Sequence, residues 1–126
     1  MSRIGRVWLG IATALIVALG LVGCSSSGNN GNSVELKAGT IVIDVRTPAE
    51  YAAGHLEGAV DMDVQSTGFT AQIAALDPKG SYVVYCRSGA RAANAEAMMK
   101  SRGFTDVVNA GGIDAAAKAT GLKIVQ

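Results

Sequence analysis

The sequence predicts an α/β domain with a central, mainly parallel sheet and helices on both faces. Short apolar runs rich in β-branched residues alternate along the chain with stretches of helical pattern. This order is typical of sheets built from strand–helix–strand units. The two clearest runs are TIVIDV at 40–45 and SYVVYC at 81–86. Because both are almost continuously apolar, they indicate strands that are buried on both faces.

The N-terminal residues 1–23 have the pattern of an export signal. Two bases, Arg3 and Arg6, precede a nearly uninterrupted apolar run that ends in LVGC at Cys24. This ending resembles the lipobox of bacterial lipoproteins, and the resemblance implies that Cys24 is acylated and becomes the new N-terminus. An uncleaved membrane helix is the alternative, since roughly 17–25 apolar residues span a bilayer. That alternative leaves the cysteine at the small-residue boundary unexplained, so we expect a lipoprotein signal peptide.

Residues 24–33 predict a flexible tether between this signal and the folded part. After Cys24 the segment contains only Ser, Gly and Asn, and such side chains cannot form a core. We therefore expect a single domain at 34–126, outside the cytoplasm in the cell envelope and attached to the membrane through the lipid. We expect that domain to be a monomer.

The first half of this domain predicts two short strands with one helix between them. The run 40–45 is the first strand. Thr47 is a candidate N-cap because Pro48 follows in the first turn and Glu50 stands three residues after it, as in a capping box. Gly54 could end this helix. A second short strand is predicted at 58–64.

The second half continues the alternation. Its patterns predict a helix at 67–76, a turn at DPKG and a strand at 81–86. They then predict a helix from about Ala90 that stops at Gly103, a last short strand and turn within 106–112, and a final helix ending at Gly121.

Charge and composition exclude some functions. The formal net charge is +1, which gives no electrostatic reason to expect a nucleic acid as partner. The chain has one histidine, His55, and two cysteines. These are too few for a four-ligand Cys/His zinc site. We expect no metal and no cofactor.

A lone cysteine, Cys86, stands where the 81–86 strand meets the following helix. Ligands of such sheets bind beyond the carboxyl ends of the strands. Backbone N–H groups of a tight loop beside a helix N-terminus can hold an anion, and Gly89 can take the positive φ that such a loop needs. The same field favours a thiolate over a thiol. The alternative is an ordinary buried cysteine.

Two arginines in this loop add positive charge. Arg91 is the informative one, because a cation in the first turn of a helix opposes the helix dipole by about 0.3–1 kcal/mol. Its position predicts a compensating anion, either a ligand or a nearby acid. Arg87 either attracts an anionic substrate or is a solvated surface charge.

The Cys-x4-Arg pattern resembles the active-site loop of rhodanese-family sulfurtransferases. Residues 43–64, IDVRTPAEYAAGHLEGAVDMDV, are similar to the first half of a rhodanese domain. Residues 82–112, YVVYCRSGARAANAEAMMKSRGFTDVVNAGG, are similar to the second half. The resemblance implies a rhodanese-like fold and a thiosulfate sulfurtransferase. Family members often carry a bulky aromatic soon after the Gly-Gly, whereas IDAAAKATG follows it here.

The resemblance also implies a persulfide mechanism. The Cys86 thiolate attacks the outer sulfur of a donor such as thiosulfate, sulfite leaves, and the loop amides stabilise the persulfide. A thiol, either small or on a protein, or cyanide then takes the sulfur. The domain has no second cysteine, so the acceptor must be another molecule.

The residues around Cys86 receive roles on the same basis. The expected substrate-binding residues are Arg87, Ser88, Gly89, Ala90 and Arg91, and those expected to support the loop are Asp44, Arg46 and Glu50. Arg91 could instead hold the loop by pairing with Asp44 or Glu50, and Asp44 could be a catalytic carboxylate. We interpret His55 as structural and Met98 and Met99 as core residues.

Two other functions compete with an anchored sulfurtransferase. A phosphatase of related fold would place one more residue between Cys and Arg, to cradle a tetrahedral phosphate. The four residues found here favour sulfur. The second alternative is a non-catalytic or sulfur-carrier module that acts with a partner protein.

Overall fold

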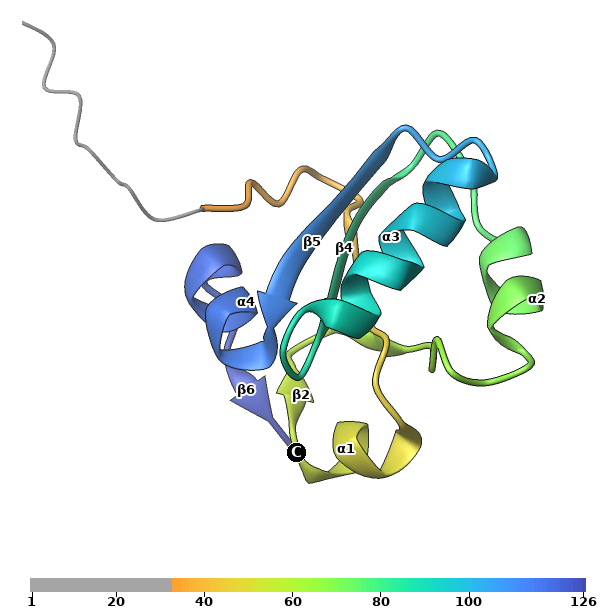
Figure 1. The fold of residues 1–126 in the computed structure, drawn as a ribbon. Helices are drawn as coiled ribbons and strands as arrows, with labels where there is room; N and C mark the ends of the chain where they lie inside the picture. Colours follow the sequence, from red (N-terminus) through yellow and green to blue (C-terminus); the bar gives the residue numbers. More distant parts are fainter. Residues whose placement is uncertain (1–32) are drawn as a thin grey trace, which may run out of the picture.

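The computed structural model describes residues 33–126, whose strands and helices alternate along the chain (Figure 1). The expected signal peptide, Cys24 and all of the tether except Ser33 lie outside the described residues. Within 33–126, no helix combines the length and apolar character that a membrane crossing needs.

A four-stranded sheet forms the centre, in the order β3-β1-β4-β5 with every neighbouring pair parallel. Its strands are β1 (Ile41–Asp44), β3 (Val60–Asp61), β4 (Ser81–Cys86) and β5 (Asp106–Gly112). The parallel sheet predicted from the sequence is therefore confirmed. The strand expected at 58–64 is wrong in length, because only two of its residues join the ladder. The chain nevertheless stays beside β1, since Met62 N–H donates to the Asp44 carbonyl at 2.8 Å.

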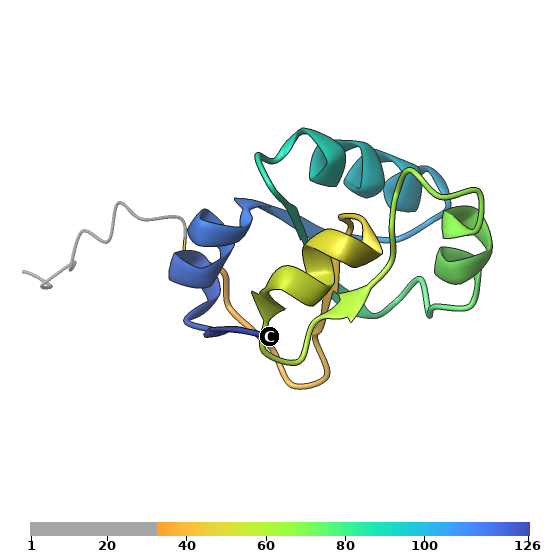
Figure 2. The same ribbon diagram turned by 90° about the horizontal axis from the view of Figure 1, so that it is seen from below.

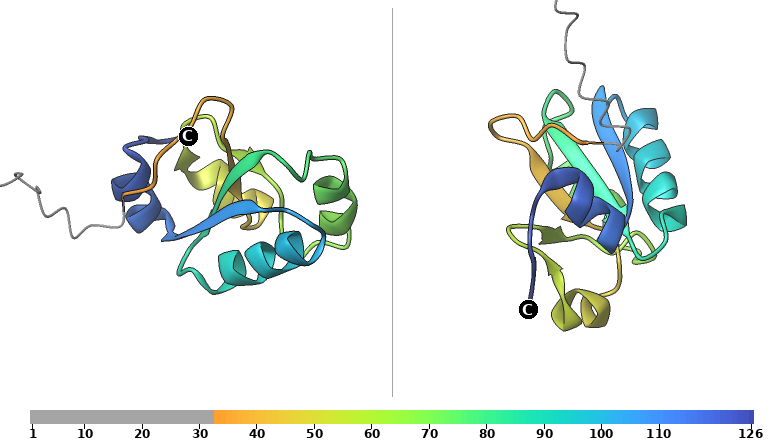
Figure 3. Two further views of the ribbon diagram at one scale, coloured as in Figure 1. Left: turned by 90° about the horizontal axis from the view of Figure 1, so that it is seen from above. Right: turned by 90° about the vertical axis from the view of Figure 1, so that its left-hand side faces the viewer.

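Helices cover both faces of the sheet, as predicted. One face carries α2 (Phe69–Ala74) and α3 (Ala90–Ser101), and the other carries α1 (Pro48–Ala53) and α4 (Ile113–Thr120). Figure 3 shows α3 and α4 on opposite sides of the strands. In Figure 2, which looks from below, α1 lies in the middle of the view between α4 and α2.

The α1 helix begins as its sequence predicts. The Thr47 hydroxyl accepts a hydrogen bond from Glu50 N–H at 3.3 Å, and the Glu50 carboxylate accepts one from Thr47 N–H at 3.0 Å. This capping box satisfies two N–H groups that the helix itself leaves free. It also fixes the direction of the Glu50 side chain, which matters for the site described below.

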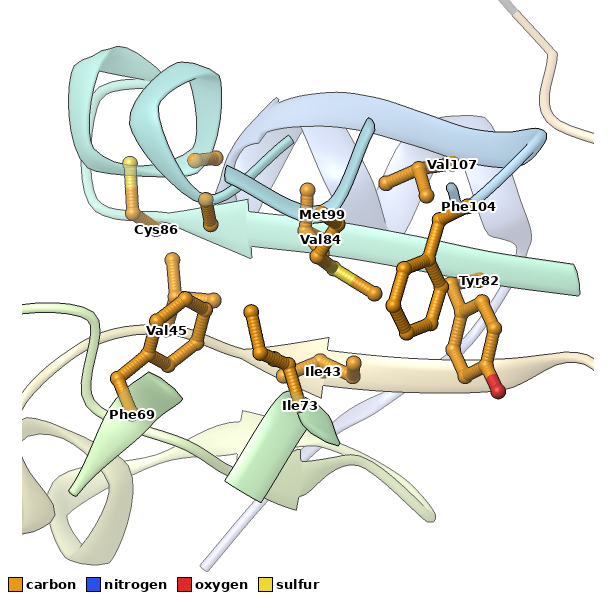
Figure 4. Close-up of a cluster of buried hydrophobic side chains, with 12 residues drawn as sticks. Ile43, Val45, Phe69, Ile73, Tyr82, Val84, Cys86, Met99, Phe104 and Val107 are labelled. Carbon is orange, nitrogen blue, oxygen red and sulfur yellow. The ribbon is translucent and has the colours of Figure 1, made fainter. Parts of the chain in front are cut away.

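The larger core lies between the sheet and the α2–α3 face. Figure 4 shows its side chains, with Val84 of β4 near Met99 of α3. Successive residues of a strand point to opposite faces, so Tyr82, Val84 and Cys86 face this core while Val83 and Tyr85 face the other. The alternation therefore places Cys86 under α3.

A second, two-stranded antiparallel sheet was not predicted. It pairs β2 (His55–Leu56) with β6 (Ile124–Val125). The sequence interpretation treated 55 as part of a loop and 106–112 as the last strand. Two-residue strands have no periodicity of their own, and this pair forms only because the fold brings distant segments together.

Tyr85 connects this small sheet to the central one. Leu56 N–H donates to the Tyr85 hydroxyl at 2.9 Å, and both side chains are fully buried. Burial also raises the pKa of Tyr85, so the hydroxyl stays protonated. The last position of β4 before Cys86 is thus tied to a segment 29 residues away.

Replacing Tyr85 with Phe should lower the free energy of unfolding by about 1–3 kcal/mol, because the buried Leu56 N–H loses its acceptor. Urea unfolding followed by circular dichroism would measure the change. The matched control is Tyr82→Phe, whose hydroxyl donates to the Asp77 carbonyl in an exposed turn. Water can replace that bond, so a loss as large in the control would contradict the role given to Tyr85.

Candidate active site

Cys86 is the last residue of β4, at the carboxyl end of the sheet, and its side chain is fully buried. A loop of three residues, 87–89, connects it to α3, which begins at Ala90 as expected. In Figure 4 the sulfur points toward this loop and the first turn of the helix. The thiol therefore lies at the position where parallel sheets place their ligands.

Gly89 provides the closest polar contact of the sulfur. Its N–H donates to Cys86 Sγ at 2.8 Å. Gly89 has φ +101°, in the left-handed region that favours glycine. The chain reverses there so that an N–H group at the start of a 12-residue helix faces the sulfur. Such a donor, together with the positive end of the helix dipole, stabilises negative charge on sulfur.

Arg91 makes a two-pronged ion pair with Glu50. Its two terminal nitrogens lie 2.8 Å and 2.9 Å from the two carboxylate oxygens. The hydrogen bonds from Arg91, helped by Thr47, lower the pKa of Glu50 to about 2, and the carboxylate raises the pKa of Arg91. Of the two acids considered from the sequence, the partner is Glu50. The pair ties the first turn of α3 to α1.

Asp44 and Arg46 form a second, more deeply buried pair. Arg46 donates to Asp44 through Nε at 2.9 Å and through a terminal nitrogen at 2.7 Å, and this hydrogen bonding raises the pKa of Arg46. Arg46 also donates to the Gly54 carbonyl and lies over the Tyr85 ring. Within residues 33–126 their hydrogen bonds do not reach the 87–89 loop. They contact Tyr85, the residue before Cys86, and Gly54 at the end of α1, so any support that they give the loop is indirect.

The remaining predicted residues divide into exposed and structural ones. Arg87, Ser88 and Ala90 are exposed at the loop, and Arg87 has no ion pair among the residues the structure describes. His55 stacks on Tyr51 with ring centroids 3.8 Å apart and pairs with β6, which is a structural position. Met99 is buried in the core and Met98 packs against it.

The sequence interpretation missed the close approach of Gly112 to the loop. A Cβ atom at Gly112 would lie 2.3 Å from the Arg87 carbonyl oxygen, so only glycine allows β5 and the loop to meet. Cys86 and Gly112 are also register partners. The Gly-Gly doublet inside a strand pattern was the available signal, since glycine there often marks a bulge or a close backbone approach.

A hollow of about 220 Å³ lies at the other end of the sheet. Ser81 and Asp106, which begin β4 and β5, line it. It is therefore separate from the Cys86 site, which lies where β4 ends. No cluster of three or more potential metal ligands occurs within residues 33–126.

Comparison with known proteins gives one family. Residues 31–119 match the family model described as the rhodanese-like domain. The thiosulfate sulfurtransferase PspE of Escherichia coli K12 is 32% identical over 71 residues, which cover 56% of this chain and 68% of PspE. The thiosulfate sulfurtransferase GlpE of Pseudomonas putida is 36% identical over 76 residues, covering 60% of this chain and 67% of GlpE.

Solved structures give the same result. A structure described as rhodanese with anions from E. coli superposes with a TM-score of 0.58 at 29% identity, covering 69% of this chain and 98% of that one. The rhodanese-like domain of the Alr3790 protein from Anabaena gives a TM-score of 0.61 at 26% identity, covering 72% of this chain and 91% of that one. The rhodanese-like fold expected from the sequence is confirmed.

Replacing Glu50 with Gln should reduce stability in a pH-dependent way. The pKa of Glu50 falls from 4.5 to about 2 on folding, so the ion pair contributes fully above pH 4.5 and its contribution is lost as the pH falls toward 2. We expect Glu50→Gln to cost about 1–2 kcal/mol at pH 7, since the pair is partly exposed. Urea unfolding across this range would measure it, with exposed Glu57→Gln as control. A difference from the wild type that stays constant with pH would contradict the pairing.

Replacing Gly112 with Ala should destabilise the protein by about 1–3 kcal/mol through overpacking. Gly112 has φ −76°, which alanine adopts without strain, so the cost arises from the Arg87 carbonyl alone. Thermal unfolding would measure the loss. Gly68→Ala is the control, because its Cβ would meet only Ser66 Oγ at 3.4 Å. Equal stability of the two variants would show that the loop moves away freely.

Proposed function

The chain belongs to the rhodanese-like domain family, and on that premise we propose that it is a sulfurtransferase that carries sulfane sulfur on Cys86. The observation that carries the proposal is the 2.8 Å contact between Gly89 N–H and Cys86 Sγ at the start of α3. A backbone donor directed at the sulfur suits a group that carries negative charge during the reaction, which supports Cys86 as the nucleophile. The similarity to the two named thiosulfate sulfurtransferases supports thiosulfate as the class of donor.

In the first half-reaction the Cys86 thiolate attacks the outer sulfur of thiosulfate. A bond forms between Sγ and that sulfur while the sulfur–sulfur bond of thiosulfate breaks, and its electron pair leaves with sulfite. The protein then carries a persulfide with one negative charge. Gly89 N–H and the N-terminus of α3 stabilise this charge, as an oxyanion hole stabilises an oxygen.

The two arginines of the loop have different tasks in this scheme. Arg91 is held by Glu50, so it fixes the first turn of the helix and contributes a stationary positive charge. Arg87 is exposed and has no ion pair among the described residues. It is therefore the residue available to attract an anionic donor, an effect that salt should weaken.

In the second half-reaction an acceptor takes the outer sulfur. Its thiolate, or cyanide, forms a bond to that sulfur, and the electron pair of the breaking bond returns to Cys86. Cys86 is the single cysteine within residues 33–126, so no neighbouring thiol of this domain can accept the sulfur. The acceptor is therefore a separate molecule, either a thiol of a small molecule or protein, or cyanide in an assay.

Incubating the purified protein with thiosulfate should add one sulfur atom to Cys86, because the thiolate displaces sulfite. Intact-mass measurement, with peptide mapping to separate Cys86 from Cys24, would detect the gain. Cys86→Ser should show none. Cyanide should remove the sulfur as thiocyanate, which shows that it is sulfane sulfur, and many thiocyanate molecules formed per protein would identify an enzyme.

Two other outcomes would change the proposal. A persulfide that resists cyanide and small thiols would favour a carrier that delivers sulfur to one partner protein. No added sulfur from thiosulfate or from a polysulfide would sink the sulfurtransferase and leave an anion-binding module.

A further inference from the structure

The register between β4 and β5 slips beside Cys86. Val84 pairs with Asn109, but Cys86 pairs with Gly112, so β5 has one residue more than β4 over this stretch. Such an extra residue is a β-bulge, which re-aims side chains and is frequent next to active sites. Gly111 lies in the bulge with φ +83°.

Asn109 hydrogen-bonds in two directions from this bulge. Its side-chain oxygen accepts from Gly111 N–H at 2.8 Å, which closes the bulge as a local turn. Its side-chain nitrogen donates to the Gly89 carbonyl at 3.2 Å. One amide side chain thus links the irregular part of β5 to the loop after Cys86.

Gly89 is consequently held on both sides. Its N–H donates to Cys86 Sγ, and its carbonyl accepts from Ala93 N–H at 2.9 Å as well as from Asn109. Fixing the peptide groups before and after a residue fixes its φ and ψ. Glycine needs such restraint more than any other residue, because it has the most conformational freedom to lose.

The hydrogen bond from Asn109 to the loop is not duplicated by another side chain of the sheet or helices that the structure describes. Within residues 33–126, Asn109 and Cys86 itself are the only residues outside the loop whose side chains hydrogen-bond to the backbone of residues 87–89. The Arg91–Glu50 pair acts further along, on the first turn of α3. The contact at Gly112 limits how closely β5 approaches the loop, but it does not orient a hydrogen-bond donor toward the sulfur.

We propose that Asn109 is a positioning residue for the Cys86 chemistry, which aims Gly89 N–H at the sulfur by holding the Gly89 carbonyl. The catalytic importance of Asn109 rests on the proposed function, whereas its effect on the orientation of Gly89 rests on the hydrogen bonds alone. Asn109 touches neither the sulfur nor the donor, so its effect is exerted through Gly89.

The test compares the rate at which iodoacetamide alkylates Cys86 at pH 7 in the full-length wild type, Asn109→Ala and Asn109→Asp, followed on the Cys86 peptide. If Gly89 N–H no longer points at Cys86 Sγ, alkylation should slow by about threefold to tenfold, which corresponds to the free energy of one hydrogen bond. The reaction of Cys86 with thiosulfate should slow to a similar degree. Asn94→Ala, an exposed asparagine on α3, is the matched control and should not change.

The two variants separate positioning from plain support of the fold. Asp retains an oxygen for Gly111 N–H but has no donor for Gly89, so we expect it to be at least as slow as Ala. If Asn109 only stabilised the bulge, Asp would behave as the wild type. If Asn109 only kept reagents away from the fully buried Cys86, the Asn109→Ala variant would be alkylated faster than the wild type. Either result, or unchanged rates in both variants, would overturn the inference.

The proposed function can fail separately. A wild type that takes no sulfur from thiosulfate would refute sulfur transfer, while the alkylation rates would still decide the role of Asn109. Thermal unfolding of each variant would show whether it is folded. If the Ala variant is not folded, the Asp variant decides, because its retained bond to Gly111 preserves the bulge. Its alkylation is then measured at high salt, which screens the charge that Asp adds near the sulfur.

Discussion

The hydrogen bond from Gly89 N–H to Cys86 Sγ is the interaction around which the rest of the site is arranged. It requires a strand that ends at the cysteine, a residue with φ +101°, and a helix that starts at the next position. Each requirement is met by a different level of structure. The strand is buried on both faces, glycine permits the reversal, and the 12-residue helix directs its positive end toward the sulfur.

Among residues 33–126, two of the arginines near the sulfur are held in ion pairs and Arg87 is in none. Arg91 is paired with Glu50 and Arg46 with Asp44. The Arg46–Asp44 pair is buried, and removing one partner of such a pair is costly because it leaves an uncompensated charge. These pairs therefore hold the ends of β1, α1 and α3 together. Arg87 remains exposed, so it is available for the role of attracting an anionic donor that we propose for it.

The second half of the chain also shapes the site from the side of β5. The bulge at Gly111, the close approach of Gly112 and the Asn109 side chain all act on the same loop. The helix α4 follows immediately and packs on the opposite face of the sheet from α3. The restraints on the loop thus belong to a strand anchored on both faces, which gives them a rigid base.

The sequence by itself determined the fold class, the order of the main elements and the place of Cys86. Continuous apolar runs, the Thr47 capping box and the glycines at helix ends are local signals, and β4, α1 and the start of α3 lie where those signals predict. The Cys-x4-Arg spacing was likewise readable, and with the flanking segments it indicated the family. Expected elements were wrong mainly in length, as with β3, because strand ends depend on neighbours rather than on local pattern.

Only the tertiary structure decided which acid pairs with Arg91, that β2 and β6 form a sheet, and that Asn109 reaches the Cys86 loop. Each of these contacts joins residues at least 20 positions apart in the chain. A single sequence contains no periodicity that links such positions, and several polar residues could serve at each one. The choice depends on how strands and helices pack, and packing is the property that local patterns do not encode.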